Sequence, residues 1–179
     1  MTNILYPWFK DAWVAIHRNQ KLPHALLFKG REGIGKRTFA LTFAKAYLCH
    51  KPLVNHLACG GCPSCEWFPL AHPDFKHISP IENEEDELSV KRKAVRKKNI
   101  VIDQIRELSA YCELTTHQEK GKRLVLIEPA DQLNENASNA LLKILEEPPE
   151  NTLFILVSSH AQKLIATIRS RCQLLELRG

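Results

Sequence analysis

The sequence reads Gly30-Arg31-Glu32-Gly33-Ile34-Gly35-Lys36-Arg37 between a short apolar run, 25–28, and a helical apolar pattern, 38–49. Glycines at three positions let successive backbone N–H groups turn toward one point, and the start of the helix adds its dipole. Lys36 adds a positive charge there. The stretch therefore predicts a strand, a phosphate-binding loop and a helix. The alternative is a glycine-rich turn without a ligand.

The residue after the lysine departs from the phosphate-loop pattern. Phosphate-loop ATPases place Ser or Thr there to bind Mg²⁺, whereas this chain has Arg37, whose guanidinium has only hydrogen-bond donors. Thr38 does not replace the missing ligand, because one step along a helix turns a side chain by about 100°. The loop is therefore expected to hold phosphate without the usual side-chain ligand for Mg²⁺.

The second half of an ATP site is expected at the end of a later buried strand, and the apolar run 124–127 is the best candidate. Such a strand usually supplies an Asp that holds Mg²⁺, often followed by a Glu that activates water. Here Glu128 stands at the metal position, and Pro129, which has no acid–base chemistry, stands at the position of the base. These losses predict that the site does not hydrolyse ATP, and they leave open whether ATP or ADP binds.

Four cysteines lie close together in the sequence: Cys49, Cys59, Cys62 and Cys65. Four thiolates suit tetrahedral zinc and leave no open position for water or substrate. Because no signal segment or membrane-spanning run is found, we expect a reducing cytoplasm, where clustered cysteines are more often metal ligands than disulfides. The sequence predicts structural zinc held by these four cysteines. The alternatives for the place of Cys49 are His50, His56 and His72.

Length and composition fit one domain, because 179 residues with 44% hydrophobic content can bury a core. Strand-like apolar runs alternate with longer helical patterns, including 7–21 and 99–114. This alternation is typical of an α/β fold, a parallel sheet with helices on both faces. The expected strands are 25–28, 75–79, 124–128, 153–158 and 173–177.

One charged segment differs from the rest of the chain. Residues 82–98 contain six basic and five acidic side chains, so the basic run at 91–98 is largely neutralised by its neighbours. We expect a flexible loop at 82–98. Contact of its lysines with the DNA backbone is the alternative.

Later stretches carry a specific resemblance. Residues 136–149 read NASNALLKILEEPP, and the apolar strand 154–159 is followed by Ile168-Arg169-Ser170-Arg171-Cys172. With Tyr6-Pro7-Trp8 near the start, these segments resemble the AAA+ subunits of clamp loaders, and among them the delta-prime subunits of bacterial DNA polymerase III. The resemblance runs over essentially the whole chain.

The resemblance implies a P-loop AAA+ domain over 1–179, a five-stranded parallel sheet with an inserted four-cysteine zinc module at about 49–72. Clamp-loader subunits continue into a helical lid and a collar domain, which this sequence does not include. The implied role is within the DNA polymerase III holoenzyme, with no ATPase or polymerase activity of its own. The implied partners are an ATPase subunit and the clamp-opening subunit, with the sliding clamp and primed DNA engaged indirectly and no membrane.

The Ser-Arg-Cys motif implies a role in a neighbouring ATP site. In clamp loaders its arginine reaches the ATP bound by the next subunit, so Arg171 is expected to be an arginine finger, Ser170 its companion, and the chain a non-hydrolysing stator. Fingers supplied in trans are worth about 10³–10⁵ in rate. The simpler alternative is that Arg169 and Arg171 stabilise the end of the preceding helix by about 0.3–1 kcal/mol. Two further alternatives are an active ATPase of the same family that uses Glu128 and an unidentified base, and a zinc-dependent nucleic-acid-binding module with a vestigial loop.

Overall fold

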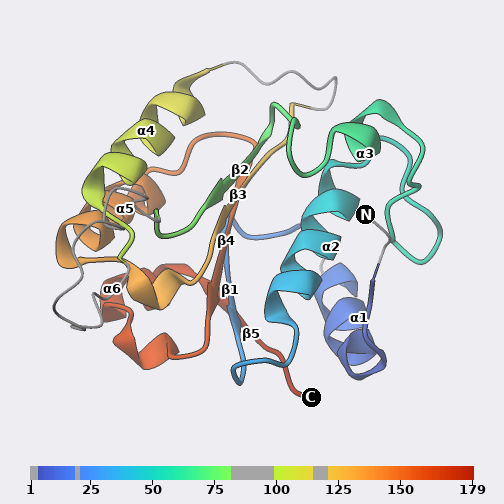
Figure 1. The fold of residues 1–179 in the computed structure, drawn as a ribbon, viewed down its shortest axis with the longest axis horizontal. Helices are drawn as coiled ribbons and strands as arrows, with labels where there is room; N and C mark the ends of the chain where they lie inside the picture. The colour runs from blue at the N-terminus through green and yellow to red at the C-terminus, as the bar shows by residue number, and fades with distance from the viewer. Residues whose placement is uncertain (1–3, 19–20, 82–98, 115–120) are drawn as a thin grey trace, which may run out of the picture.

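A five-stranded sheet lies at the centre of the molecule, and all neighbouring strands run parallel (Figure 1). The computed structural model describes residues 4–18, 21–81, 99–114 and 121–179. The strand order is β2-β3-β4-β1-β5. The expected parallel α/β sheet is thus confirmed, with strands β1 Ala25–Lys29, β2 Phe75–Ile78, β3 Arg123–Ile127, β4 Thr152–Ser158 and β5 Gln173–Glu176.

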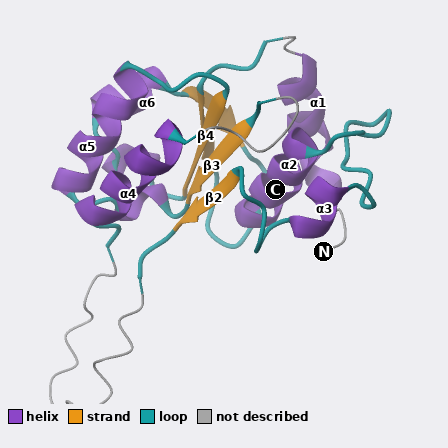
Figure 2. Ribbon diagram, turned by 90° about the horizontal axis from the view of Figure 1, so that it is seen from above, coloured by secondary structure: helices purple, strands orange, loops and turns teal. Residues whose placement is uncertain are grey.

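Helices cover both faces of this sheet, as the alternation of patterns predicted. α1, α2 and α3 lie on one face, and α4, α5 and α6 lie on the other (Figure 1 and Figure 2). Short 3-10 turns occur at Pro7–Phe9, Ala130–Gln132 and Ala161–Lys163. The helices are α1 Lys10–Arg18, α2 Lys36–Leu48, α3 Pro63–Trp67, α4 Ile102–Glu113, α5 Glu135–Glu146 and α6 Ala166–Arg171.

The central strands β1, β3 and β4 are buried on both faces, which is why they read as unbroken apolar runs rather than alternating patterns. In β1, Leu26 and Phe28 pack into the core on the side of α1 and α2, while Ala25 and Leu27 pack into the core on the side of α4 and α5. Every residue of β3 and β4 is buried. Because a slip of one residue would exchange the two sets of side chains, these cores fix the strand register.

The helix expected at 99–114 begins later, at Ile102. Ile100 instead pairs with Leu133. The Ile100 N–H donates to the carbonyl of Gln132 at 2.8 Å, and the Ile100 carbonyl accepts from the Asn134 N–H at 3.1 Å. This pairing keeps Ile100 extended and delays the helix, a tertiary effect that the local pattern does not contain.

The charged segment 82–98, expected to be a flexible loop, lies outside the described residues. Within the described ranges, no helix combines the length and apolar character needed to cross a membrane.

Arg123 opens β3 and lies buried beside the end of α4. Its Nη1 donates to the carbonyl of Cys112 at 2.8 Å, and its Nη2 donates to the carbonyl of Leu114 at 2.7 Å. The guanidinium carbon lies 4.6 Å from the centre of the Tyr111 ring. Because the last carbonyls of a helix have no partner within the helix, Arg123 supplies the donors that tie the end of α4 to the sheet.

Replacing Arg123 by Met should lower the free energy of unfolding by about 1–3 kcal/mol, because two carbonyls lose their donors while the apolar stem is retained. The matched control is Arg106→Met, at an exposed position of α4, which should change stability by less than about 0.5 kcal/mol. Denaturant unfolding followed by circular dichroism measures both. Equal stability of the two variants would contradict the capping role of Arg123.

Candidate functional site

Three parallel strands end at one edge of the sheet, the edge at which open α/β sheets bind ligands. β1 is followed by Gly30, β3 by Glu128 and β4 by Ser159. Lys29 pairs with Ser158, and the Gly30 N–H donates to the Ser158 carbonyl at 3.4 Å. The two halves of the ATP site expected from the sequence therefore meet at this edge.

The loop predicted to bind phosphate is curved by two glycines in left-handed conformations. Gly33 has φ 79° and Gly35, the N-cap of α2, has φ 93°. The helix thus starts directly after Gly35, two residues before the predicted start at 38. A methyl group on Gly35 would lie 2.6 Å from Cε2 of Tyr6, and Trp8 Nε1 donates to the carbonyl of Ile34 at 3.2 Å. The N-terminal aromatic side chains therefore pack directly against the loop.

The ammonium group of Lys36 is held across the loop. Lys36 is buried, and its Nζ donates to the carbonyl of Arg31 at 2.7 Å and to Oγ of Ser159 at 2.8 Å. Burial lowers the pKa of Lys36 below its ordinary value, and the negative charges of Asp131 and Glu128 oppose that shift. The loop lysine and the end of β4 are thus linked by a hydrogen bond that the sequence did not predict.

Arg37 and Glu128, two residues that the sequence singled out separately, lie together. Arg37 Nε is 3.6 Å from Oε2 of Glu128, and His77 Nε2 is 3.6 Å from the same oxygen. About 65% of the Arg37 side chain is exposed, against 16% for Glu128. Pro129 follows directly, so no carboxylate stands at the position next to Glu128 where a base would be expected.

Asp131 is a second acidic residue near the loop, and the sequence reasoning missed it as a site residue. Ser158 Oγ donates to Oδ1 of Asp131, and His160 Nδ1 lies 3.6 Å from Oδ2. Asp131 sits in the 3-10 turn after β3 rather than at the strand end, so the strand-end pattern did not indicate it. Both of its oxygens already have partners within the protein.

The four cysteines meet at the end of α2. Their sulfur atoms lie within 4.8 Å of one another, with Cys49 to Cys62 at 3.9 Å and Cys59 to Cys65 at 4.0 Å. Sulfurs bound at about 2.3 Å to one tetrahedral ion lie about 3.8 Å apart. A backbone N–H of Gly61 lowers the pKa of Cys59 to about 6, while burial raises that of Cys65 to about 12. The cluster can hold one metal ion.

His72, an alternative fourth ligand, has both ring nitrogens engaged elsewhere. Ser64 Oγ donates to the carbonyl of Leu48 at 2.7 Å and lies 2.9 Å from His72 Nε2, while the Asp74 N–H donates to Nδ1 at 3.1 Å. His72 therefore links the cysteine module to the end of α2. Among the described residues, none of the three alternative histidines groups with the sulfurs: His50, His56 and His72.

Comparison with known proteins agrees with this architecture. The family model described as "DNA polymerase III, delta subunit" matches residues 7–179. The chain belongs to the delta-prime family of DNA polymerase III subunits. It is 38% identical over 169 residues to the delta-prime subunit of Pseudomonas aeruginosa, covering 94% of this chain and 47% of that protein. For the Escherichia coli delta-prime subunit, identity is 32% over 174 residues, with 94% and 47% covered.

This delta-prime family chain spans about half the length of the curated relatives it matches. Among solved structures, a DNA polymerase III gamma subunit-related protein from Thermotoga maritima superimposes with a TM-score of 0.62 at 20% sequence identity. That superposition covers 96% of this chain and 46% of the other. It supports the fold, since the sequence identity is too low to carry more.

Arg171 of this delta-prime family chain lies at the end of α6 and is held by two contacts. Its Nη2 donates to Oε1 of Glu146 at 3.0 Å, and its Nη1 donates to the carbonyl of Thr167 at 3.1 Å. Ser170 Oγ donates to the same Thr167 carbonyl at 3.0 Å. About 33% of the Arg171 side chain is exposed. α6 lies on the sheet face opposite α2, so Arg171 is on the other side of the sheet from the phosphate-loop helix (Figure 2).

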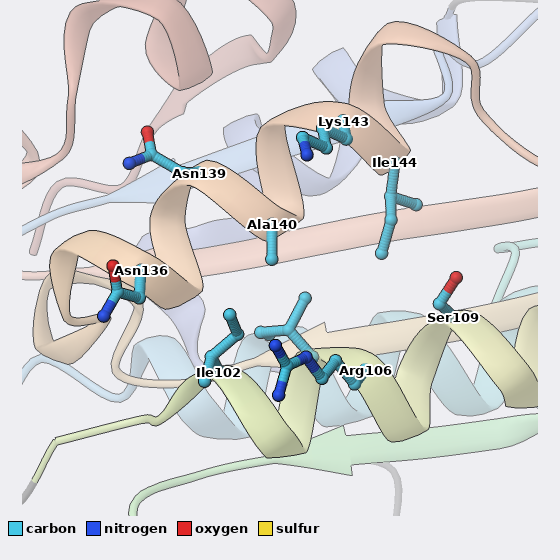
Figure 3. A pocket seen from close by; sticks show the side chains of 9 residues that line it. Ile102, Arg106, Ser109, Asn136, Asn139, Ala140, Lys143 and Ile144 are labelled. Atoms are coloured by element: carbon cyan, nitrogen blue, oxygen red, sulfur yellow. The ribbon is translucent and has the colours of Figure 1, made fainter.

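A groove of about 400 Å³ runs between α4 and α5, and the sequence reasoning did not indicate it (Figure 3). The segment 136–149 that carried the delta-prime resemblance supplies one wall. Arg106 contributes a positive charge from α4 and Lys143 another from α5. The other residues that line it are Ile102, Ile105, Ser109, Asn136, Asn139, Ala140 and Ile144.

The glycine conformations predict how the loop tolerates substitution. Gly35→Ala should lower the free energy of unfolding by about 2–4 kcal/mol, because a left-handed backbone is strained for alanine and the methyl group meets the Tyr6 ring. Gly33→Ala is the matched control: its φ is also positive, but a Cβ there meets nothing within 4 Å. It should cost about 1 kcal/mol from backbone strain alone. Thermal unfolding of both variants measures the difference, and a smaller effect at Gly35 would contradict the packing of Tyr6 on the loop.

Proposed function

We propose that this chain is a clamp-loader subunit that hydrolyses no ATP of its own and donates Arg171 to the ATP site of a neighbouring ATPase subunit. Its work is to help that subunit load the sliding clamp on primed DNA, beside the clamp-opening subunit, in the cytoplasm. Family membership supports the place in the assembly. The observation that carries the rest is the position of Arg171 relative to the chain's own phosphate loop.

The strand register separates Arg171 from that loop. Gln173, two residues after Arg171, pairs with Leu26 near the start of β1, whereas Glu176 pairs with Lys29 at its end. Three residue steps in a strand cover about 10 Å. Arg171 therefore stands toward the amino edge of the sheet and the phosphate loop at the carboxyl edge. An arginine in this position is suited to a phosphate group bound by another subunit.

The contacts of Arg171 also test the simpler alternative, in which this arginine only stabilises the C-terminal end of α6. The bond to the Thr167 carbonyl serves the last turn of α6, as that alternative requires. The bond to Glu146 does not, because Glu146 belongs to α5 and holds the guanidinium near the surface from a different element. This tether supports a positioned arginine with part of its surface open to a partner.

The chain's own loop supports the absence of hydrolysis. Arg37 stands where a Ser or Thr would bind Mg²⁺, and its guanidinium is paired with Glu128, the strand-end carboxylate. Asp131, the other nearby carboxylate, accepts a hydrogen bond from Ser158 and faces His160. The active-ATPase alternative requires Glu128 together with a base that the sequence did not identify, and Pro129 stands where that base is expected.

Zinc is the metal we propose for the four-cysteine cluster. Four thiolates at the spacing of a tetrahedral ion leave no position for substrate, so the ion is structural. When bound it supplies the positive charge that four clustered sulfurs need, and it joins the end of α2 to the module formed by residues 49–72.

Arg171→Ala, in the full-length protein within a reconstituted clamp loader, should leave assembly intact and reduce hydrolysis at the neighbouring ATP site about 10³-fold or more. Arg171→Lys should recover little, because lysine keeps the charge but not the forked donor geometry. The measurement is steady-state ATP hydrolysis with clamp and primed DNA.

Two variants control this experiment. Arg169→Ala removes the same charge from the same helix and should have little effect on the rate. Lys36→Ala disables the chain's own loop and should be far less damaging than Arg171→Ala. If Lys36→Ala proves the more damaging, the chain hydrolyses its own ATP and the proposed function is wrong.

Protein prepared with zinc under reducing conditions should contain about one zinc per chain, measured by elemental analysis. Cys62→Ser should lower the zinc content and make residues 49–72 more sensitive to limited proteolysis, since metal binding stabilises the modules that carry such sites. Cys112→Ser, outside the cluster, is the control and should keep the metal. Metal-free wild-type protein under these conditions would end the zinc proposal.

A further inference from the structure

The contact between Arg37 and Glu128 joins the two positions that share a magnesium ion in phosphate-loop nucleoside triphosphatases. There, the ion lies between the residue after the loop lysine and the carboxylate at the end of the strand. In this chain the same two positions hold Arg37 and Glu128, with Nε and Oε2 3.6 Å apart. A positive charge that belongs to the chain itself thus stands beside the strand-end carboxylate.

The usual ion does not fit beside this pair. Mg²⁺ requires oxygen ligands at about 2.0–2.1 Å in octahedral geometry, and a guanidinium offers only N–H donors. A divalent cation placed beside Glu128 would also meet the charge of Arg37 at a few ångströms. Two like charges about 4 Å apart near a protein surface repel each other strongly enough to lower the affinity for the cation by more than tenfold.

The remaining parts of the loop still suit an anion. Gly33 and Gly35 keep left-handed conformations that turn the backbone around one point, and Lys36 already spans the loop through two neutral acceptors, the Arg31 carbonyl and Ser159 Oγ. Phosphate oxygens are stronger acceptors for an ammonium group than either of these.

Arg37 itself has donor capacity to spare. Its side chain is 65% exposed, and the 3.6 Å between its Nε and Oε2 of Glu128 is too long for a hydrogen bond. Oε2 of Glu128 and Nε2 of His77 are buried atoms without a hydrogen-bond partner among the described residues. Oε2 of Glu128 thus accepts no hydrogen bond from Arg37. The terminal N–H groups of Arg37 can therefore turn to an anion without breaking a hydrogen bond to this oxygen.

We infer that the guanidinium of Arg37 takes the place of the magnesium ion, so that the loop binds condensed phosphate groups in their metal-free form and binds the magnesium-loaded form less tightly. The ligand class is the di- or triphosphate chain, whether inorganic or part of a nucleotide. The inference concerns the phosphate loop alone, and it holds whether or not Arg171 acts on a neighbouring subunit.

The test is calorimetric titration of the chain with inorganic tripolyphosphate, once with a chelator and once with excess Mg²⁺. Arg37→Thr restores the side chain that binds Mg²⁺ in related loops. Lys36→Ala identifies the site, and Arg18→Thr, at an exposed arginine near the end of α1, controls for the loss of one positive charge. Circular dichroism checks that each variant is folded.

Wild-type protein and Arg18→Thr should bind metal-free tripolyphosphate, with affinity reduced on the order of tenfold or more by Mg²⁺, and Lys36→Ala should abolish binding. Because Mg²⁺ also binds tripolyphosphate in solution, the deciding result is the reversal in Arg37→Thr. That variant should lose metal-free affinity on the order of tenfold and bind better with Mg²⁺ than without it. The inference is overturned if Arg37→Thr keeps the wild-type response to Mg²⁺, or if wild-type protein does not bind the metal-free anion.

Discussion

The parallel register of β1 against β4 is the constraint on which the site depends. Lys29 opposite Ser158 places the start of the phosphate loop beside the end of β4, and Lys36 can then reach Ser159. The register is held by burial on both sides of the sheet, since β1 sends alternate side chains into two separate cores. A one-residue slip would exchange those side chains, which makes the placement of the loop a consequence of hydrophobic packing.

The same sheet separates two groups of charged residues in one chain. The carboxyl edge carries the loop with Lys36, Arg37 and Glu128, and Arg171 stands toward the amino edge beside α5. The Arg37–Glu128 pair contributes little to stability, because ion pairs with so exposed a partner are typically worth about 0–1 kcal/mol. The pair matters because it places a positive charge beside the carboxylate of Glu128. Substitutions of Arg37 should therefore test anion binding by the loop without unfolding the protein.

Much of this architecture could be predicted from the sequence, for identifiable reasons. All five strands were placed nearly to their ends. The central strands β1, β3 and β4 are buried on both faces and therefore read as continuous apolar runs. Phosphate binding requires glycines close together in the sequence, and a metal site of this kind requires closely spaced cysteines, so both features can be recognised from local sequence. The sequence also identified Arg37 and Pro129 as departures from an ATPase. What it could not supply were contacts between distant segments, such as Lys36 with Ser159 or Arg37 with Glu128.

The later start of α4 has a similar origin, because Ile100 is extended by pairing with Leu133 and not by its own neighbours. His72 illustrates the same limit. The sequence left it as an alternative to Cys49 for the fourth ligand, and only the folded chain shows its ring bonded to Ser64 and Asp74. The local sequence pattern predicts helices and strands, whereas tertiary packing decides which residues they contact.

Helix α2 is tied down at both ends. Gly35 at its N-cap belongs to the phosphate loop, and Cys49 at its C-cap belongs to the sulfur cluster. Helices ordinarily fray from their termini, where the backbone groups lack intrahelical partners. With both ends held, α2 is expected to behave as a stiff rod about 20 Å long. A disturbance at the cysteine module would thus reach the phosphate loop as a tilt or shift of the whole helix, rather than being absorbed by an unwinding turn.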